Sequence, residues 1–442
     1  MKRIDLRGAV ETEIAKLLAK TAFDEVIVSE KVRGRIEQTF GADLTPTALV
    51  EKIVQDVRRG GDQAVLDYTA KIDGVTLSVA GMEVSVAEKE LAMAAIEPEL
   101  MAALRQAAEN VRQFHQEQRE NDRPWSSTRG DQSWVGQRRT PMDRAGVYVP
   151  GGTAAYPSSV LMTAIPAVVA GVREVIMMVP PAKDGSVNPL VLAAATLAGV
   201  HRIFRIGGAQ AIAALAFGTE TIPRVDKIVG PGNLFVTLAK KAVYGHCDID
   251  MLAGPSEIMI VADGSAKPAF IAADMLSQAE HDELASSILV TDNEALANQV
   301  EQELELQLAD LPRSATARTA LDKQGLILLV DDLGQAVQCV NAAAPEHLEI
   351  ITTEPAALLP GIRHAGAIFL GAWTPEPLGD YFAGPSHVLP TGGTARYASV
   401  LNVDTFMKTT SIIAYGERDL SSQAAAIIRL AEAEGLSAHA RA

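Results

Sequence analysis

From Arg144 onward, short β-rich runs alternate with segments of helical pattern along most of the chain. The runs are GVYVP, EVIMMVP, RIFRIG, DKIVG, EIMIVAD, SSILVTD, LILLVDD, EIITT and AIFLG. Most of the first eight precede a helical pattern, as AQAIAALAFG follows RIFRIG. This alternation is typical of βα units, in which helices cover both faces of a parallel sheet. So many strands predict two sheets, and therefore two α/β domains with a cleft between them.

The region before Arg144 predicts mainly helices. Ser85 and Glu88 have the spacing of a capping box, which marks a helix start. A long polar helix is expected from about Pro98 to Asn121, with His115 on its solvated face. No residue pattern in this region indicates a catalytic or ligand-binding site.

Length and charge narrow the possible functions. The 442 residues are enough for two or three domains, and the net charge of −16 argues against binding to nucleic acid or anionic lipid. The two cysteines, Cys247 and Cys339, cannot form a disulfide framework or a cysteine-rich zinc site. The N-terminus lacks a signal-peptide core, and the longest apolar run, Val160 to Val172, is too short to span a membrane. A cytoplasmic protein with neither nucleic acid nor membrane as partner is expected.

The segment Ala344-Pro345-Glu346-His347-Leu348 places a carboxylate beside an imidazole. Proline disfavours helical geometry in the residue before it and suits the first position of a helix. If a helix or single turn begins at Pro345, Glu346 and His347 lie in its first turn, where the helix dipole favours a carboxylate and disfavours an imidazolium. Both groups would then be bases near neutral pH, as oxidation of an alcohol to an acid requires. An exposed polar turn is the alternative.

Three expected strand-to-helix turns are rich in glycine. They are Gly151-Gly152, Gly207-Gly208-Ala209-Gln210 and Gly230-Pro231-Gly232-Asn233. Glycine lets the backbone approach a ligand, and helix N-termini attract phosphate, so a dinucleotide fits. The usual fingerprint is incomplete, because Phe235 occupies the third glycine position. Tight turns that need a positive φ explain these glycines equally well.

Two later segments carry polar groups that could bind a ligand. A helix expected from about Pro268 to Ala285 holds Gln278 and His281, which are three residues apart and therefore neighbours on its surface. They could share a metal, although glutamine is an uncommon zinc ligand and an ordinary polar face is the alternative. Gly379-Asp380-Tyr381 and Pro385-Ser386-His387 predict loops of the kind that line sites.

Taken together, these blocks resemble the histidinol dehydrogenase family from about Leu44 onward. The resemblance is densest in GVYVPGGTAAYPSSVLMTAIPAVVAGV, IGGAQAIAALAFGTETIPRVDKIVGPGNLFV, IDMLAGPSEIMIVAD, LSQAEHD, APEHL and LGDYFAGPSHVLPT. The order and number of the blocks carry the assignment, since no short motif among them is decisive.

The resemblance implies an α/β fold of two incomplete Rossmann-like domains, similar to that of aldehyde dehydrogenases. It also implies a C-terminal tail exchanged between the subunits of a homodimer. The expected divisions are a helical region at 1–135, an NAD-binding domain at 136–255, a catalytic domain at 256–395 and the tail at 396–442.

The resemblance also assigns roles to residues. The implied reaction is the zinc- and NAD-dependent oxidation of L-histidinol to L-histidine through enzyme-held L-histidinaldehyde, the last two steps of histidine biosynthesis. The catalytic pair would be Glu346 and His347, and the zinc ligands would be Gln278, His281, Asp380 and His439. Substrate contacts would be the zinc ligands with Ser256, His347, His387 and Glu434. NAD contacts would be Tyr148, Gln210 and Asn233.

Three other functions stay open at this point. A related zinc and NAD dehydrogenase could act on another polar alcohol or diol, with Ser386 and the pocket around Glu434 making the difference. A zinc hydrolase could use Glu346 as its base without a nicotinamide. A binding protein could keep the fold without catalysis.

Overall fold

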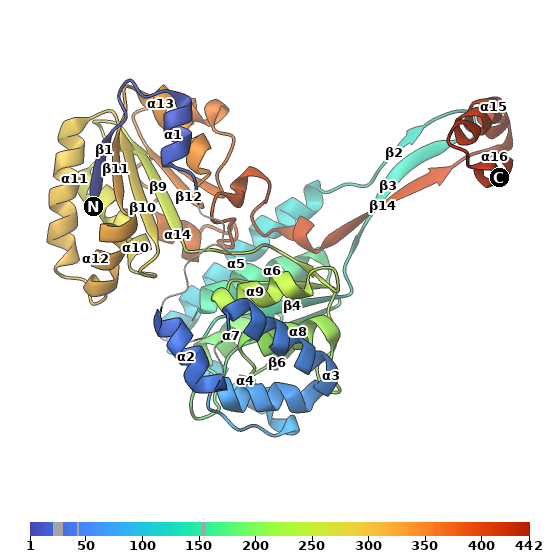
Figure 1. Cartoon of the computed structure of the whole chain (residues 1–442), viewed down its shortest axis with the longest axis horizontal. Coiled ribbons are helices and arrows are strands. Elements are labelled where there is room, and N and C mark those ends of the chain that lie inside the picture. Colours follow the sequence, from blue (N-terminus) through green and yellow to red (C-terminus); the bar gives the residue numbers. More distant parts are fainter. Residues whose placement is uncertain (21–29, 42–43, 152–155) are drawn as a thin grey trace.

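The computed structural model of the chain describes residues 1–20, 30–41, 44–151 and 156–442. Two α/β lobes lie side by side, and a long arm carries the last helices away from both (Figure 1). Gly152, part of one glycine-rich turn, lies outside the described residues. None of the helices that the structure describes has both the length and the apolar character needed to cross a bilayer.

The first lobe contains a parallel sheet of five strands in the order β6-β5-β4-β7-β8. Its strands are β4 (Arg144–Tyr148), β5 (Glu174–Met178), β6 (Arg202–Phe204), β7 (Lys227–Val229) and β8 (Asp248–Ile249). One face packs against α4 (Val86–Ala95), α5 (Pro98–Asn121), α6 (Pro157–Ala170) and α7 (Pro189–Ala198). The other packs against α2 (Glu30–Phe40), α3 (Pro46–Ile72), α8 (Gly208–Phe217) and α9 (Leu234–Val243), and the short η1 (Val79–Gly81) precedes α4.

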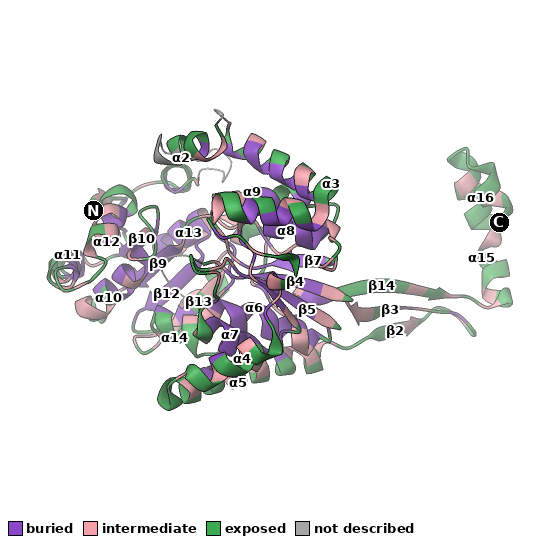
Figure 2. Ribbon diagram, turned by 90° about the horizontal axis from the view of Figure 1, so that it is seen from below, coloured by how far each residue is buried: buried purple, intermediate pink, exposed green. Residues whose placement is uncertain are grey.

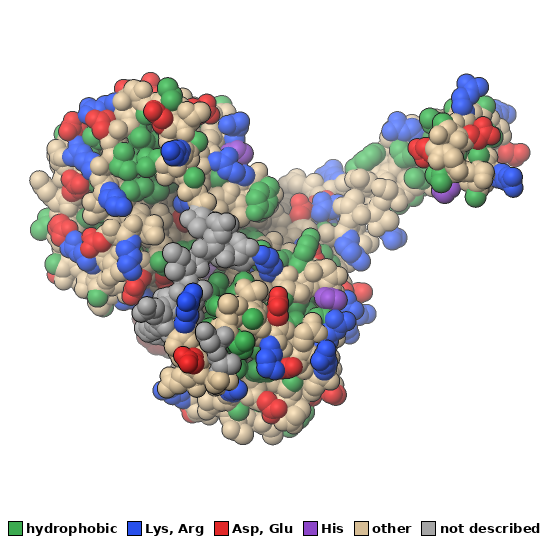
Figure 3. Space-filling model, viewed as in Figure 1, with side chains coloured by type: hydrophobic (Ala, Val, Ile, Leu, Met, Phe, Trp, Pro, Cys, Tyr) green, Lys and Arg blue, Asp and Glu red, His purple; other side chains and the backbone are tan. Residues whose placement is uncertain are grey.

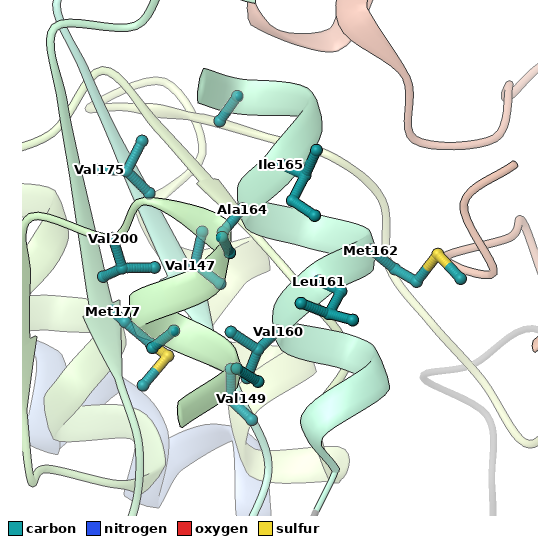
Figure 4. Packing of buried hydrophobic residues seen from close by; sticks show 14 of the residues in the cluster. Val147, Val149, Val160, Leu161, Met162, Ala164, Ile165, Val175, Met177 and Val200 are labelled. Atoms are coloured by element: carbon teal, nitrogen blue, oxygen red, sulfur yellow. The ribbon is translucent and has the colours of Figure 1, made fainter. Parts of the chain in front are cut away.

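Successive residues of β5 serve opposite faces of this sheet, as the pleat of a strand requires. Val175 and Met177 belong to the core under α6, and Figure 4 shows Met177 on the side nearer Val160. Ile176 and Met178 belong to the core on the other face. A strand buried on both faces reads as a continuous apolar run, which is why EVIMM was recognisable.

The second lobe contains a parallel sheet of six strands in the order β1-β11-β10-β9-β12-β13. Its strands are β1 (Lys2–Asp5), β9 (Glu257–Ala262), β10 (Ser286–Thr291), β11 (Leu326–Leu329), β12 (His347–Ile351) and β13 (Ala367–Leu370). Helices α10 (Pro268–Ala279), α11 (Glu294–Leu308) and α12 (Ser314–Gln324) cover one face. Helices α1 (Glu11–Leu17) and α13 (Leu333–Ala343) cover the other, and η2 (Pro355–Gly361) and α14 (Glu376–Tyr381) complete the lobe.

The arm is an antiparallel sheet in the order β14-β3-β2. Its strands are β2 (Trp125–Thr128), β3 (Trp134–Pro141) and β14 (Met407–Ala414). The short helices η3 (Thr394–Arg396) and η4 (Val403–Phe406) precede β14 in the chain. The chain ends in α15 (Glu417–Ala433) and α16 (Ser437–Arg441) at the tip of the arm. Helix α15 has no buried residue within one chain (Figure 2).

The structure confirms all nine predicted strands, the polar helix α5 and the capping box at Ser85. Strand β1 and the arm were not predicted, and β1 joins the second sheet although it lies at the start of the chain. The predicted exposure of His115 is wrong: its side chain is buried, and Nδ1 lies 2.7 Å from the carbonyl oxygen of Val111. The domain boundaries stay a prediction.

Candidate functional site

Glu346 and His347 lie at the amino edge of the six-stranded sheet. Strand β12 begins at His347, which pairs with Ile258 near the start of β9. The predicted helix start at Pro345 is therefore wrong. Helix α13 ends at Ala343, and Ala344 adopts a left-handed conformation with φ of 47° that turns the chain straight into the strand. The run after His347 forms a buried strand and not a helix, so the pair does not lie in the first turn of a helix as predicted.

The protonation of this pair also differs from the prediction. Burial raises the pKa of Glu346 to about 8. Burial by itself lowers the pKa of His347, but the carboxylate of Glu346 and those of α14 outweigh it and raise this pKa to about 10. In the polypeptide alone both groups therefore favour their protonated forms at neutral pH. A divalent cation bound nearby would lower both pKa values, because positive charge favours the deprotonated forms.

Three other elements contribute polar groups around the imidazole of His347, two of them side chains and one a backbone carbonyl. Its Nδ1 lies 3.1 Å from Nε2 of Gln278, in the last turn of α10, and 3.1 Å from the carbonyl oxygen of Glu257. Its Nε2 lies 3.5 Å from a carboxylate oxygen of Asp380 on α14. The amide N–H of Glu257 donates to the carboxylate of Glu346 at 2.8 Å. Residues far apart in the sequence thus meet at one sheet edge.

The donor atoms at this edge fit a divalent metal ion. His347, Glu376 and Asp380 offer one nitrogen and two carboxylate oxygens that all lie within 4.8 Å of one another. Nε2 of His347 and Oε1 of Glu376 are buried without a hydrogen-bond partner among the described residues. Imidazole and carboxylate together suit zinc and similar ions.

Glu376 was missed in the sequence because Gly379-Asp380-Tyr381 was expected to be a loop. The structure places this segment in α14, so that prediction is wrong. Glu376 and Asp380 are four residues apart and share one face of the helix. That spacing was the signal available in the sequence.

The four predicted zinc ligands are only partly brought together within one chain. Gln278 and Asp380 both approach His347. His281 lies just beyond α10, because the helix ends at Ala279 and not at the predicted Ala285. Burial lowers the pKa of His281 while Asp380 raises it, which places His281 within electrostatic reach of the cluster. His439 lies in α16 at the tip of the arm (Figure 1).

Two predicted substrate contacts lie at this edge, and a third does not. Ser256 directly precedes β9. His387 touches both lobes: its Nδ1 lies 3.0 Å from the carbonyl oxygen of Asp380, and its Nε2 lies 3.4 Å from the hydroxyl of Ser159 on α6. Glu434 follows α15 in the arm. The edge thus faces the other lobe, and Figure 3 shows the two lobes as distinct masses.

Ser386, beside His387, fixes this loop to the first lobe. Its buried hydroxyl donates to the carbonyl oxygen of Met162 at 3.0 Å and accepts from the N–H of Val388 at 3.2 Å. We expect Ser386→Ala to lower the free energy of unfolding by about 1–3 kcal/mol, because it strands a buried carbonyl and a buried N–H. Urea unfolding measures this, with the exposed-loop variant Ser186→Ala as control. Equal free energies of unfolding for the two variants would contradict the proposed role of Ser386 in fixing the loop to the first lobe.

The predicted nucleotide contacts lie at the carboxyl edge of the five-stranded sheet. Strand order reverses between β4 and β7, and ligands of α/β sheets bind at such a switch point. The hydroxyl of Tyr148, at the end of β4, accepts from the N–H of Gly208 at 3.1 Å. Gln210 is fully buried, and its Oε1 lacks a hydrogen-bond partner in the described part of the chain. Asn233 caps α9, accepting from two backbone N–H groups at 3.1 and 3.3 Å.

Gly230, directly after β7, needs to be glycine. Its φ is 111°, and a Cβ at this position would lie 2.1 Å from the carbonyl oxygen of Tyr148. The alternative prediction, a tight turn that needs a positive φ, is therefore confirmed at Gly230, and approach of the backbone to a ligand stays a prediction. The amide oxygen of Gln210 without a hydrogen-bond partner, together with a turn that contains two glycines, fits a polar ligand such as a dinucleotide.

Comparison with known proteins identifies the family. A model of the histidinol dehydrogenase family matches residues 41–442. The chain is 55% identical over 392 residues to histidinol dehydrogenase of Syntrophotalea carbinolica, which covers 89% of this chain and 90% of the relative. It is 49% identical over 443 residues to the Geobacter metallireducens enzyme, covering 100% of this chain and 97% of the relative.

A solved structure supports the same family assignment. The crystal structure of histidinol dehydrogenase from Elizabethkingia anophelis superimposes with a TM-score of 0.90 at 34% identity, covering 100% of this chain and 96% of that one. The match therefore includes both lobes and the arm. On the family model, the relatives and this fold, the chain belongs to the histidinol dehydrogenase family of oxidoreductases.

Proposed function

We propose that this chain oxidises L-histidinol to L-histidine through L-histidinaldehyde, with one zinc ion per subunit and two molecules of NAD per turnover. The observation that carries the proposal is the buried Glu346–His347 pair, held beside Gln278 and Asp380 at an edge facing the other lobe. Such a reaction completes histidine biosynthesis, and we place it in the cytoplasm.

The residues that would hold the two bound groups come from different lobes. Gln278, His281, Asp380 and His439 would hold zinc, and Tyr148, Gln210 and Asn233 would hold NAD. Glu376 faces the same point as Asp380 and is a further candidate ligand. When bound, zinc would orient the substrate and NAD would accept hydride.

The chain's own side chains would move the protons. His347 takes the proton of the alcohol in the first oxidation. Glu346 takes a proton from the water that attacks the aldehyde, and His347 takes the hydroxyl proton of the hydrate in the second oxidation. Two bases are needed because the alcohol and the water are different oxygens, and the start of β12 places both side chains at one edge.

We further propose a homodimer in which the arm of each subunit reaches the site of the other. Helix α15 has no buried residue in one chain, and the apolar side chains of Ile427, Ile428 and Leu430 are exposed on it. Glu434 and His439 are remote from the His347 cluster within one chain (Figure 1). A site that contains them needs the tail of a second copy.

Deleting Ser437 to Ala442 should therefore remove both bound zinc and activity, because it removes His439. Metal analysis of the purified protein measures zinc per subunit. Arg441→Ala, which changes the same helix but keeps His439, should retain zinc and is the control. Full zinc content after the deletion would rule out His439 as a ligand.

The overall reaction is tested by its stoichiometry. Purified protein given limiting L-histidinol and excess NAD should form L-histidine and two NADH for each histidinol consumed. A yield of one NADH would show that the reaction stops at the aldehyde, and the absence of NADH would refute the proposed function.

A further inference from the structure

A buried ion pair lies beneath the turn that follows β7. Lys240 on α9 and Asp250, just after β8, form an ion pair, and their side chains are only 3% and 1% exposed. Neither residue has a part in the proton transfers above. Transferring two charges from water to the protein interior costs free energy, so stabilisation of the fold does not by itself explain a pair buried this completely.

The pair binds both polar backbone atoms of Gly230. The ammonium of Lys240 donates to the carbonyl oxygen of Gly230 at 3.0 Å. The carboxylate of Asp250 accepts from the N–H of Gly230 at 2.7 Å and from the N–H of Met251 at 2.6 Å. Hydrogen bonds to charged groups are stronger than neutral ones, so the orientation of Gly230 is tightly fixed.

The orientation of Gly230 controls the surface offered to a dinucleotide. Gly230 packs its α-carbon against the carbonyl of Tyr148, and the same turn leads to Asn233, the cap of α9. Two of the three expected NAD contacts are therefore positioned relative to each other through this one glycine.

We propose that Lys240 and Asp250 are positioning residues for NAD, which hold the Gly230 turn in the conformation that the dinucleotide binds. This inference rests on the proposed function. It assigns the pair an effect on the affinity for NAD and none on the affinity for the alcohol or on the proton transfers, because those side chains belong to the other lobe.

The test is the double variant Lys240→Gln/Asp250→Asn, which removes both charges and keeps polar groups of similar size. We expect the dissociation constant for NAD, measured by calorimetry, to rise about tenfold, as the loss of charge-assisted hydrogen bonds implies. KM for NAD should rise with it, whereas kcat at saturating NAD and KM for L-histidinol should stay within about twofold.

A second ion pair in the same sheet provides a control. Lys227 on β7 and Asp248 on β8 lie with 2.8 Å between their charged atoms, Asp248 is partly exposed, and neither side chain bonds to Gly230. Lys227→Gln/Asp248→Asn should leave the affinity for NAD unchanged. An equal loss of NAD affinity in this control would overturn the positioning role.

Unchanged NAD affinity in a folded Lys240→Gln/Asp250→Asn protein would also overturn it. If that protein melts below the assay temperature, its dissociation constant for NAD is compared with that of the wild type at a lower temperature at which both are folded, and it should again be about tenfold higher. A value equal to that of the wild type would then refute the role. Wild-type protein that fails to bind NAD would instead refute the proposed function.

Discussion

Replacing His347 by asparagine is expected to lower kcat of both oxidations by roughly a hundred- to ten-thousand-fold, the range attributed to a positioned general base. Asparagine is smaller but polar, so it can still face the amide of Gln278, 3.1 Å from the native ring. The loss would then report on proton transfer and not on collapse of the edge. Separate assays with L-histidinol and with L-histidinaldehyde, each followed by NADH absorbance, measure the two steps.

A matched control is His246→Asn, at an exposed histidine in the loop after α9. It should keep wild-type rates for both substrates. If His347→Asn retained more than roughly a tenth of kcat in either oxidation, a single base serving both steps would be excluded.

Replacing Glu346 by glutamine should separate the two oxidations. The amide keeps an oxygen that can accept the N–H of Glu257, a bond of 2.8 Å in the native chain, but it cannot take a proton from water. Removing this carboxylate also removes a charge that raises the pKa of His347, which favours the basic imidazole. Alcohol oxidation should therefore survive, while the aldehyde step slows by about a hundredfold or more.

Rapid-mixing kinetics would reveal this difference directly. Glu346→Gln should release one NADH per site quickly and the second slowly, with aldehyde accumulating on the enzyme. Equal slowing of both NADH phases would contradict the division of labour between Glu346 and His347.

The fold could be predicted from the sequence where burial leaves a strong pattern. The central strands of the two sheets are buried on both faces, so apolar runs such as EIMIVA and SSILVT mark β9 and β10 clearly. The arm could not be predicted in this way. Strand β14 is mostly exposed, with lysine, threonine and serine along it, so no burial pattern distinguishes it from a loop.

The candidate site was harder to predict than the fold, for two reasons. The first reason is that the local sequence and the tertiary structure favour different conformations at Pro345. The proline suits a helix start, but the run after His347 forms the strand that pairs with both β9 and β13. The sheet edge was also unknown. Ligands of parallel sheets usually bind at the carboxyl edge, but Glu346 and His347 lie at the amino edge, where α10 returns with Gln278.

For the glycine-rich turns, the sequence left two explanations open that the structure could test in part. At Gly230 the sequence allowed either a strained turn or a ligand-binding turn, and the left-handed φ together with the contact to Tyr148 confirms the strained turn. Sequence alone could not find the Lys240–Asp250 pair, because α9 and β8 bring these residues together only when the sheet forms.

The central claim is that each site combines the two lobes of one chain with the tail of another, and mixed dimers test it most directly. His439→Ala and Glu346→Gln subunits, each nearly inactive in the complete reaction, are unfolded, mixed in equal amounts and refolded together. Random pairing should restore roughly a quarter of wild-type activity, because half of the dimers are mixed and each mixed dimer holds one intact site. Activity no higher than that of the separate variants, with mixed dimers shown to form, would contradict the claim.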